Sequence, residues 1–265
     1  MKKPLPIIIA IIVFLVFIGG FFWYLKGRGS GGTALPTPTP EGKLIETALE
    51  ERPYVTLTPS QDGHWLTLKI ERIRHGDSLE YELIYNTASG VPQGSTNAVE
   101  LKGEDSYTKK ILLGTESRGN YRYDEGVTQG TLTLRFRSDE GVRKFITEFY
   151  LHQGEEELTS VDNRFSLNGQ PQSSDFYLVM STVGLPGDFE EEVVAGPYEV
   201  FSSATKPIKN AQVTLALEET GEASLYSWGG KDWILMEGTQ KKTSALTAPL
   251  DELTTVIAGT VSISE

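Results

Sequence analysis

Residues 64–85 read HWLTLKIERIRHGDSLEYELIY, and this stretch decides the fold class. Apolar and polar side chains alternate over residues 65–70, and they alternate again over residues 79–85. A period of two is typical of strands that place one face on a core and the other in solvent. The corner His75-Gly76-Asp77 predicts a hairpin turn between these two strands.

Strand patterns continue along the rest of the chain. The run TLTLRFRS at 131–138 alternates in the same way, with leucines and Phe136 on one face and arginines on the other. Further strand-like runs lie at 54–57, 175–181, 198–201, 211–217, 223–228, 233–236 and 254–262. Half-buried strands joined by polar turns favour antiparallel sheets. We predict an all-β body of two antiparallel β-sandwich domains, residues 43–168 and 169–265, with no internal repeat relating them.

Residues 142–150 fit two patterns. Their apolar side chains fall on one helix face, but 145, 147, 149 and 151 also alternate as they would in a strand. The preceding Asp139-Glu140-Gly141 is typical of a hairpin turn, and aromatic residues and threonine favour strands. We therefore predict a strand here.

The N-terminal stretch LPIIIAIIVFLVFIGGFFWYL, residues 5–25, contains no charged residue. At about 1.5 Å per residue a helix of this length spans roughly 31 Å, the thickness of a bilayer core. A cleaved signal peptide has a shorter apolar region that ends in small residues, whereas this run ends in the aromatic residues FFWY. We predict that residues 1–26 are an uncleaved transmembrane anchor, in contact with the lipid bilayer through residues 5–25.

Residues 27–42, GRGSGGTALPTPTPEG, form a linker with a flexible Gly/Ser half and a stiff Thr/Pro half. Basic residues flank both ends of the apolar run, so the charge rule for membrane orientation is nearly balanced. A stalk of this kind holds a domain away from a membrane. We therefore expect a single-pass protein of the cytoplasmic membrane with its C-terminal body outside the cytoplasm.

The apolar run 5–25, the TPTP stalk at 37–40 and the alternating strands together resemble bacterial single-pass, membrane-anchored surface proteins with Ig-like or other β-sandwich modules. The resemblance implies a cell-surface location and a binding, adhesion or envelope-structural role. It lies in the architecture and carries over no functional residues, because a sandwich supports many unrelated functions.

Charge and composition exclude several function classes. The formal net charge is −12, and all 36 acidic residues lie after residue 40, so a phosphate backbone would be repelled and we expect no nucleic acid partner. The absence of cysteine excludes disulfides, thiolate nucleophiles and cysteine-ligated metals. The chain has no G-x-S-x-G elbow and no S-x-x-K motif followed by K-T-G. We expect a non-catalytic protein without a cofactor. The alternative is a cell-envelope hydrolase, or an accessory carbohydrate-binding module of one.

Aromatic residues near the C-terminus give a candidate ligand site. Tyr226, Trp228 and Trp233 flank the turn Gly229-Gly230-Lys231-Asp232. A four-residue loop places Trp228 opposite Trp233, whereas a two-residue loop places Tyr226 there. If these rings are exposed they can stack on a sugar, which suggests a cell-wall glycan as partner, and if they are buried they belong to the core. An envelope protein is the other partner considered.

An acidic loop gives a candidate metal site. Asp188, Glu190 and Glu192 follow Gly187, and oxygen-rich loops bind calcium. The alternating D-x-D-x-D-G pattern is absent, and consecutive glutamates point in different directions. Solvated surface charge is the plainer interpretation.

Overall fold

The computed structural model describes residues 42–204, 206–218 and 222–260. In this part of the chain the regular structure is β-strand, apart from a 3-10 helix at Leu49–Glu51, so the all-β prediction is confirmed. The predicted anchor, residues 1–26, lies outside the described residues, as do all but the last residue of the linker. A search of the described residues finds no helix with the length and apolar character needed to span a bilayer.

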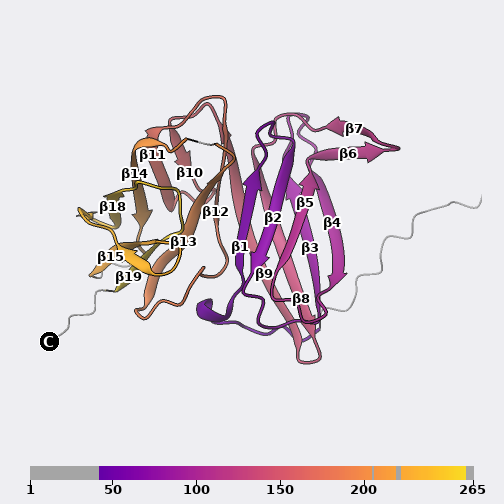
Figure 1. The fold of residues 1–265 in the computed structure, drawn as a ribbon, viewed down its shortest axis with the longest axis horizontal. Helices are drawn as coiled ribbons and strands as arrows, with labels where there is room; N and C mark the ends of the chain where they lie inside the picture. The colour runs from indigo at the N-terminus through magenta and orange to yellow at the C-terminus, as the bar shows by residue number, and fades with distance from the viewer. Residues whose placement is uncertain (1–41, 205, 219–221, 261–265) are drawn as a thin grey trace, which may run out of the picture. The chain divides into compact units, whose positions relative to one another are not determined.

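The strands form one large sheet and three smaller ones, and every strand pair is antiparallel (Figure 1). The large sheet has the order β16 (Trp233–Leu235), β15 (Ala223–Trp228), β19 (Val256–Thr260), β13 (Val193–Ser202), β12 (Phe176–Ser181), β9 (Gly141–Gln153), β8 (Gln129–Ser138), β3 (Ser78–Tyr85), β4 (Gln93–Glu100).

The three smaller sheets are built as follows. A three-stranded sheet has the order β1 (Tyr54–Pro59), β2 (Trp65–Glu71), β5 (Tyr107–Leu112). A five-stranded sheet has the order β10 (Glu157–Thr159), β11 (Phe165–Gln170), β14 (Lys209–Ala216), β18 (Ala245–Pro249), β17 (Gln240–Lys242). A separate hairpin consists of β6 (Gly114–Ser117) and β7 (Asn120–Tyr123).

Two hydrophobic cores lie between these sheets, and β12 contributes to both. Leu178 and Met180 pack into the first core together with residues of β1, β2, β3 and β8. Their neighbours Tyr177 and Val179 pack into the second core with residues of β11, β14 and β18. Because side chains alternate along a strand, β12 is buried on both faces and forms a wall that the two cores share.

The predicted domain boundary between 168 and 169 falls inside β11. Phe165 and Leu167, which precede this point, belong to the second core. Phe201, which follows it, packs into the first core. The domain limits themselves stay a prediction, but the chain does not pass from one core to the other at a single point.

The turn that precedes β2 is repeated before β11. In the first turn Ser60 Oγ donates to Asp62 Oδ1 at 2.5 Å, and the same carboxylate accepts from the amide of residue 64 at 3.1 Å. In the second turn Ser160, Asp162 and the amide of residue 164 have the same bonds at the same distances. The residue after each aspartate, Gly63 or Asn163, has a positive φ. A serine–aspartate turn therefore recurs 100 positions later, although we expected no repeat.

The strand order around this turn is also repeated. In the first half the pair β1–β2 is followed by β3–β4 in the large sheet, and β5 then returns to pair with β2. In the second half β10–β11 is followed by β12–β13 in the large sheet, and β14 returns to pair with β11. The two halves thus share a five-strand arrangement that their sequences do not display.

Two local predictions have different outcomes. The strand predicted at 142–150 is confirmed, because it forms part of β9 and pairs with β8 through a two-residue turn. The hairpin predicted at His75-Gly76-Asp77 is wrong, because β2 and β3 lie in different sheets. The segment between them instead crosses from one sheet to the other, beginning at Arg72 with φ 58°. Alternating strands with a polar connection are common to both arrangements, so the pattern alone did not separate them.

Candidate functional site

Four aromatic rings, two of them exposed and two half-buried, form a row at one end of the first half. The ring of His64 stacks on Tyr123, with centroids 3.9 Å apart and planes within 8°. The rings of Tyr121 and Tyr123 are parallel within 4°, with centroids 6.3 Å apart. Trp65 meets Tyr121 edge-on at 5.7 Å. We call these four residues the aromatic ladder.

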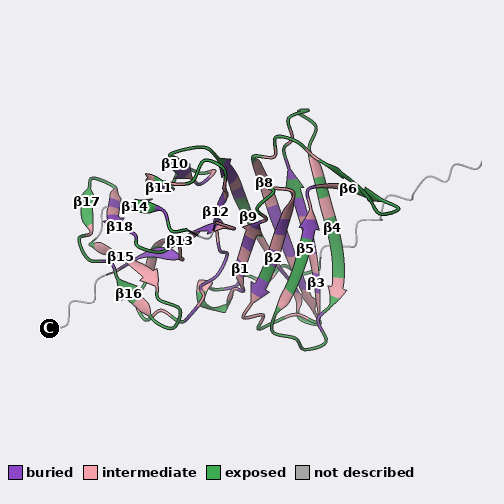
Figure 2. Cartoon of the chain, turned by 45° about the horizontal axis from the view of Figure 1, so that its top comes forward, coloured by how far each residue is buried: buried purple, intermediate pink, exposed green. Residues whose placement is uncertain are grey.

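The β6–β7 hairpin positions the two tyrosines of the ladder. Arg118 and Gly119 at its tip both have positive φ, which suits the two-residue turns that match strand twist. Tyr121 and Tyr123 are two residues apart and therefore lie on one face of β7. Tyr121 is 48% exposed and Tyr123 is 38% exposed. Figure 2 shows this hairpin projecting from the body with most of its length exposed.

The base of the hairpin is fixed to the strand that carries His64 and Trp65. The amide of Leu113 donates to the His64 carbonyl at 2.9 Å, and the amide of Asp124 donates to the Leu113 carbonyl at 3.0 Å. Tyr85 Oη donates to the Asp124 carboxylate at 2.9 Å. The ladder is therefore held at both ends of the hairpin base and is largely formed before any ligand binds.

A polar surface continues from the ladder across the three-stranded sheet. The core-facing leucines of β2 place Trp65 and Thr67 on its outer face. Lys110 Nζ lies 4.7 Å from the ring centre of Trp65, a cation–π contact. The outer face also carries four threonines: Thr56, Thr58, Thr67, Thr108. Next to the hairpin, a cleft of about 570 Å³ is lined by Tyr123, Arg122 and neighbouring polar residues. Hydroxyl groups, cationic groups and the carboxylates of Asp124 and Glu125 thus lie around the rings.

The predicted ligand-binding residues form a second aromatic cluster. Trp228 lies opposite Trp233 across the hairpin, so the four-residue loop is the one formed. Their rings meet edge-on at 5.4 Å. Phe189, which the sequence did not indicate, meets Tyr226 at 5.0 Å and Trp233 at 5.7 Å. The structure therefore brings all three predicted residues together with a fourth ring.

Parts of this C-terminal cluster are covered by the chain itself, although Trp228 also lines an open cleft of about 890 Å³. Gly187 lies so close under the Trp228 ring that a Cβ there would come within 2.1 Å of it. Phe189 packs on Gly259 in the same way, at 2.6 Å from the position of a Cβ. The cluster thus clamps the segment around residues 187–189 onto the large sheet, and its role in ligand binding stays a prediction.

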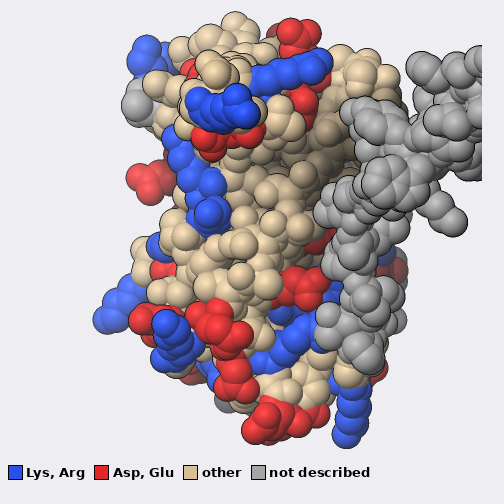
Figure 3. Space-filling view, turned by 90° about the vertical axis from the view of Figure 1, so that its right-hand side faces the viewer, with Lys and Arg blue, Asp and Glu red and all other residues tan. Residues whose placement is uncertain are grey.

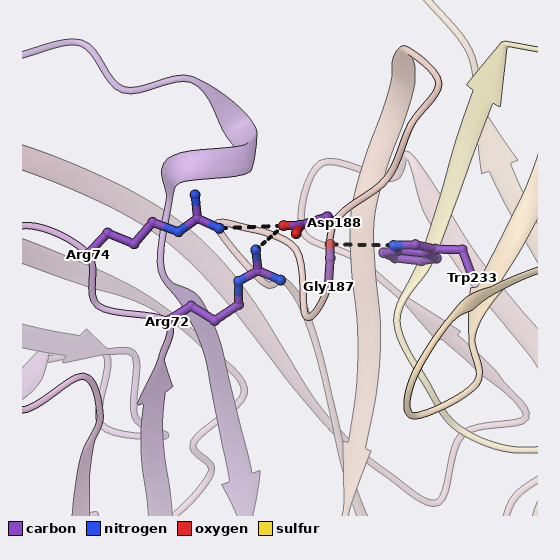
Figure 4. Close-up of polar contacts among 5 residues, drawn as sticks. All are labelled: Arg72, Arg74, Gly187, Asp188 and Trp233. Carbon is purple, nitrogen blue, oxygen red and sulfur yellow. Dashed lines mark hydrogen bonds and ion pairs between the residues drawn. The ribbon is translucent and has the colours of Figure 1, made fainter.

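Two arginines contact the acidic loop at Asp188, next to Gly187, which contacts the C-terminal cluster (Figure 4). Asp188 accepts from Arg72 and lies 3.4 Å from Nη2 of Arg74. The hydrogen bond from Arg72 and its positive charge lower the pKa of Asp188 below its ordinary value. The amide of Thr260 donates to the Glu192 carbonyl at 2.9 Å, and the amide of Glu192 donates to Thr260 Oγ1 at 3.3 Å. In the part of the chain described, no three His, Asp or Glu residues are grouped to hold a metal, and the metal role predicted for Asp188, Glu190 and Glu192 gains no support.

Two features bear on the alternative of catalysis. A cleft of about 750 Å³, lined in part by residues 44–48, has a single carboxylate in its lining, Glu46. A second carboxyl, Glu199, accepts from Tyr54 Oη at 2.7 Å and also from Thr255. Burial raises the pKa of Glu199, whereas these two hydrogen bonds oppose the rise. Glu199 does not line this cleft, so the cleft lacks the pair of carboxylates that a glycosidase needs. A larger cleft of about 890 Å³ has Glu237, Asp251 and Glu252 in its lining, and all three are exposed.

His152 is the most buried of the three histidines, and it is fully bonded. Its Nδ1 lies against Glu155, and its Nε2 accepts from the Thr159 amide at 3.1 Å. Tyr150 stacks on the ring at 3.9 Å. These contacts tie β9 to β10 and give His152 a structural role.

Comparison with known proteins adds no relationship to this description: no protein-family model matches the chain, and no curated protein is significantly similar to it.

Proposed function

We propose that this protein is a non-catalytic binding module, tethered to the cytoplasmic membrane, that holds a cell-envelope glycan on its outer surface. The observation that carries the proposal is the aromatic ladder, in which half-exposed tyrosine rings lie parallel beside Trp65 and Lys110. Aromatic faces pack against the apolar faces of sugar rings, while hydroxyl and cationic groups satisfy the sugar oxygens. The outer face of the three-stranded sheet offers both kinds of group.

The location of the protein is proposed from its sequence. Residues 5–25 are long and apolar enough to span a bilayer, and residues 27–42 suit a stalk. The body that follows, in which two cores share β12, would then lie outside the cytoplasm. This arrangement would place the ladder within reach of wall or envelope polymers.

The glycan proposal is tested by substitution of the ladder. The double variant Tyr121→Ala/Tyr123→Ala is expected to weaken retention by a cell-envelope polysaccharide by roughly fivefold or more. This magnitude takes each ring–sugar contact to be worth as much as a pair of aromatic rings, about 0.5–1.5 kcal/mol. Mobility in native gels that contain soluble anionic or neutral polysaccharide measures the retention. The variant should melt within a few degrees of the wild type, since both rings are on the projecting hairpin.

Substitution of the C-terminal cluster is the matched control. Trp233→Ala also removes a half-buried ring, but it is expected to leave retention unchanged. If Trp233→Ala reduces retention and the ladder variant does not, the binding site lies at the C-terminal cluster. If neither polysaccharide retards the wild-type protein, glycan binding is ruled out.

The tether is tested by extraction and proteolysis. The full-length protein is expected to remain with membranes in alkaline carbonate, whereas a chain lacking residues 1–26 should be released. Protease added to intact cells should remove the body. Release of the full chain by carbonate contradicts the anchor, and protection of the body contradicts the orientation.

A further inference from the structure

The strand β4 forms an uncovered edge of the large sheet. It pairs with β3 over eight consecutive residues without a bulge, from Ser78 opposite Glu100 to Tyr85 opposite Gln93. No strand of the described residues pairs with its other side. Half of the backbone amides and carbonyls of β4 therefore point away from the sheet, where another strand can bond to them.

The other sheet edges are protected in ways that β4 is not. The end strands β10, β16 and β17 have only three residues each, and the hairpin strands β6 and β7 have four each. The edge strand β5 carries Lys109 and Lys110. On β1 the amide of Val55 already donates to the Thr182 carbonyl at 2.9 Å. Short length, lysine and covering segments all hinder strand addition, and among the described residues β4 shows none of these protections.

The sequence of β4 is uncharged over residues 93–99 and contains no proline. Figure 3 looks onto the side of the molecule that carries this strand, and its centre is largely free of charged groups. Lys, Arg, Asp and Glu side chains lie above this area, along the left of it and across the lower part of the view. A body with many more acidic than basic residues therefore has a strip where a second copy meets little repulsion.

The second half of the molecule shows how the equivalent edge is covered. By the repeated strand order, β13 corresponds to β4, since each follows its hairpin partner in the large sheet. The far side of β13 pairs antiparallel with β19. No strand of the described residues takes the same position beside β4, so an antiparallel strand there completes an arrangement that the molecule already uses once.

We propose that two copies of this chain associate through their β4 strands, antiparallel, to give one continuous sheet. Residues 93, 95, 97 and 99 lie opposite core residues of β3, so the even-numbered residues face outward. A two-fold axis perpendicular to the sheet keeps both cores on the same side. The uncharged stretch is centred on Thr96, which places Thr96 of one copy opposite Thr96 of the other. Gly94 then lies opposite Ala98, and the two Glu100 carboxylates lie at opposite ends of the paired strands.

A single cysteine tests this register, because the chain has no cysteine of its own. Full-length Thr96→Cys is expected to form a disulfide-linked dimer under mild oxidation, since opposite residues of paired strands lie within disulfide reach. The control is Ile84→Cys, which is exposed on the neighbouring strand β3 and faces outward. Ile84→Cys should not form a disulfide-linked dimer, because the two β4 strands lie between residue 84 of one copy and residue 84 of the other.

Light scattering of the full-length chain in detergent gives a second measurement. The wild type is expected at twice the mass of one chain, and Thr96→Lys at the mass of one chain, because two ammonium groups would face each other. Thr131→Lys, which adds the same charge on the outer face of the interior strand β8, should stay dimeric. The proposal is overturned if the wild type is monomeric, or if Thr96→Cys and Ile84→Cys cross-link equally. Neither outcome depends on glycan binding.

Discussion

A fragment of residues 42–168 is expected to be unfolded, although it contains the whole of the first predicted domain. The first core includes Leu178, Met180 and Phe201, which this fragment lacks. Loss of each such buried side chain costs about 2–5 kcal/mol, and a domain of this size has only about 5–15 kcal/mol of stability. Strand β9 would also lose its partner β12. Circular dichroism and the dispersion of amide resonances measure the outcome.

Point substitutions in β12 test the same idea in the intact chain. Leu178→Ala removes contacts from the first core and Tyr177→Ala from the second, and each is expected to cost about 2–5 kcal/mol. Because the strand is shared, both variants should lower the midpoint of one common unfolding transition. A cooperatively folded 42–168 fragment, or two transitions of which each variant shifts only one, would show that the halves fold independently.

The strands with a core face were predictable because their burial follows the alternation in the sequence. Residues 65–70 and 79–85 became β2 and β3, with a buried leucine, isoleucine or tyrosine at every second position. Strand β4 was missed, because its residues are polar on both faces and only β3 beside it makes them a strand. The link between β2 and β3 was misjudged for a related reason: pairing depends on which sheet each strand joins, and local sequence does not carry that information.

The candidate site was only partly predictable. The pairing of Trp228 with Trp233 follows from a short hairpin, so the sequence placed these two rings together. The aromatic ladder joins His64 and Trp65 to two tyrosines of β7, more than 50 positions away, through the fold alone. The Arg-Gly tip followed by tyrosines two residues apart was the local sign of an exposed hairpin, but it did not indicate which rings would meet it.

The repeated serine–aspartate turn gives a matched pair of substitutions. Asp162→Ala is expected to cost about 2–4 kcal/mol, whereas Asp62→Ala should cost about 0.5–1.5 kcal/mol. Both carboxylates accept from a serine and a backbone amide, but Asp162 also accepts from the buried Tyr198. Removal of Asp162 leaves the Tyr198 hydroxyl without its acceptor inside the protein. After removal of Asp62, the Ser60 hydroxyl and the amide of residue 64 can form hydrogen bonds with water instead. Denaturant unfolding at neutral pH measures both values.

The pH dependence of stability in these two variants separates two effects of each substitution: loss of the carboxylate charge, which depends on pH, and loss of side-chain volume, which does not. Burial raises the pKa of Asp162, but hydrogen bonds from Ser160, Tyr198 and the amide of residue 164 outweigh it, and the net pKa is lowered. The Ser60 bond lowers the pKa of Asp62 in the same direction. A folded-state pKa below the unfolded value of about 3.9 stabilises the protein above that pH, and this contribution is lost as the pH falls through the folded pKa.

The gap in unfolding free energy between the wild type and each variant should therefore shrink in acid. A gap for Asp162→Ala that stays constant down to pH 3, or that equals the gap for Asp62→Ala at pH 7, would mean that the buried hydroxyl does not depend on the carboxylate.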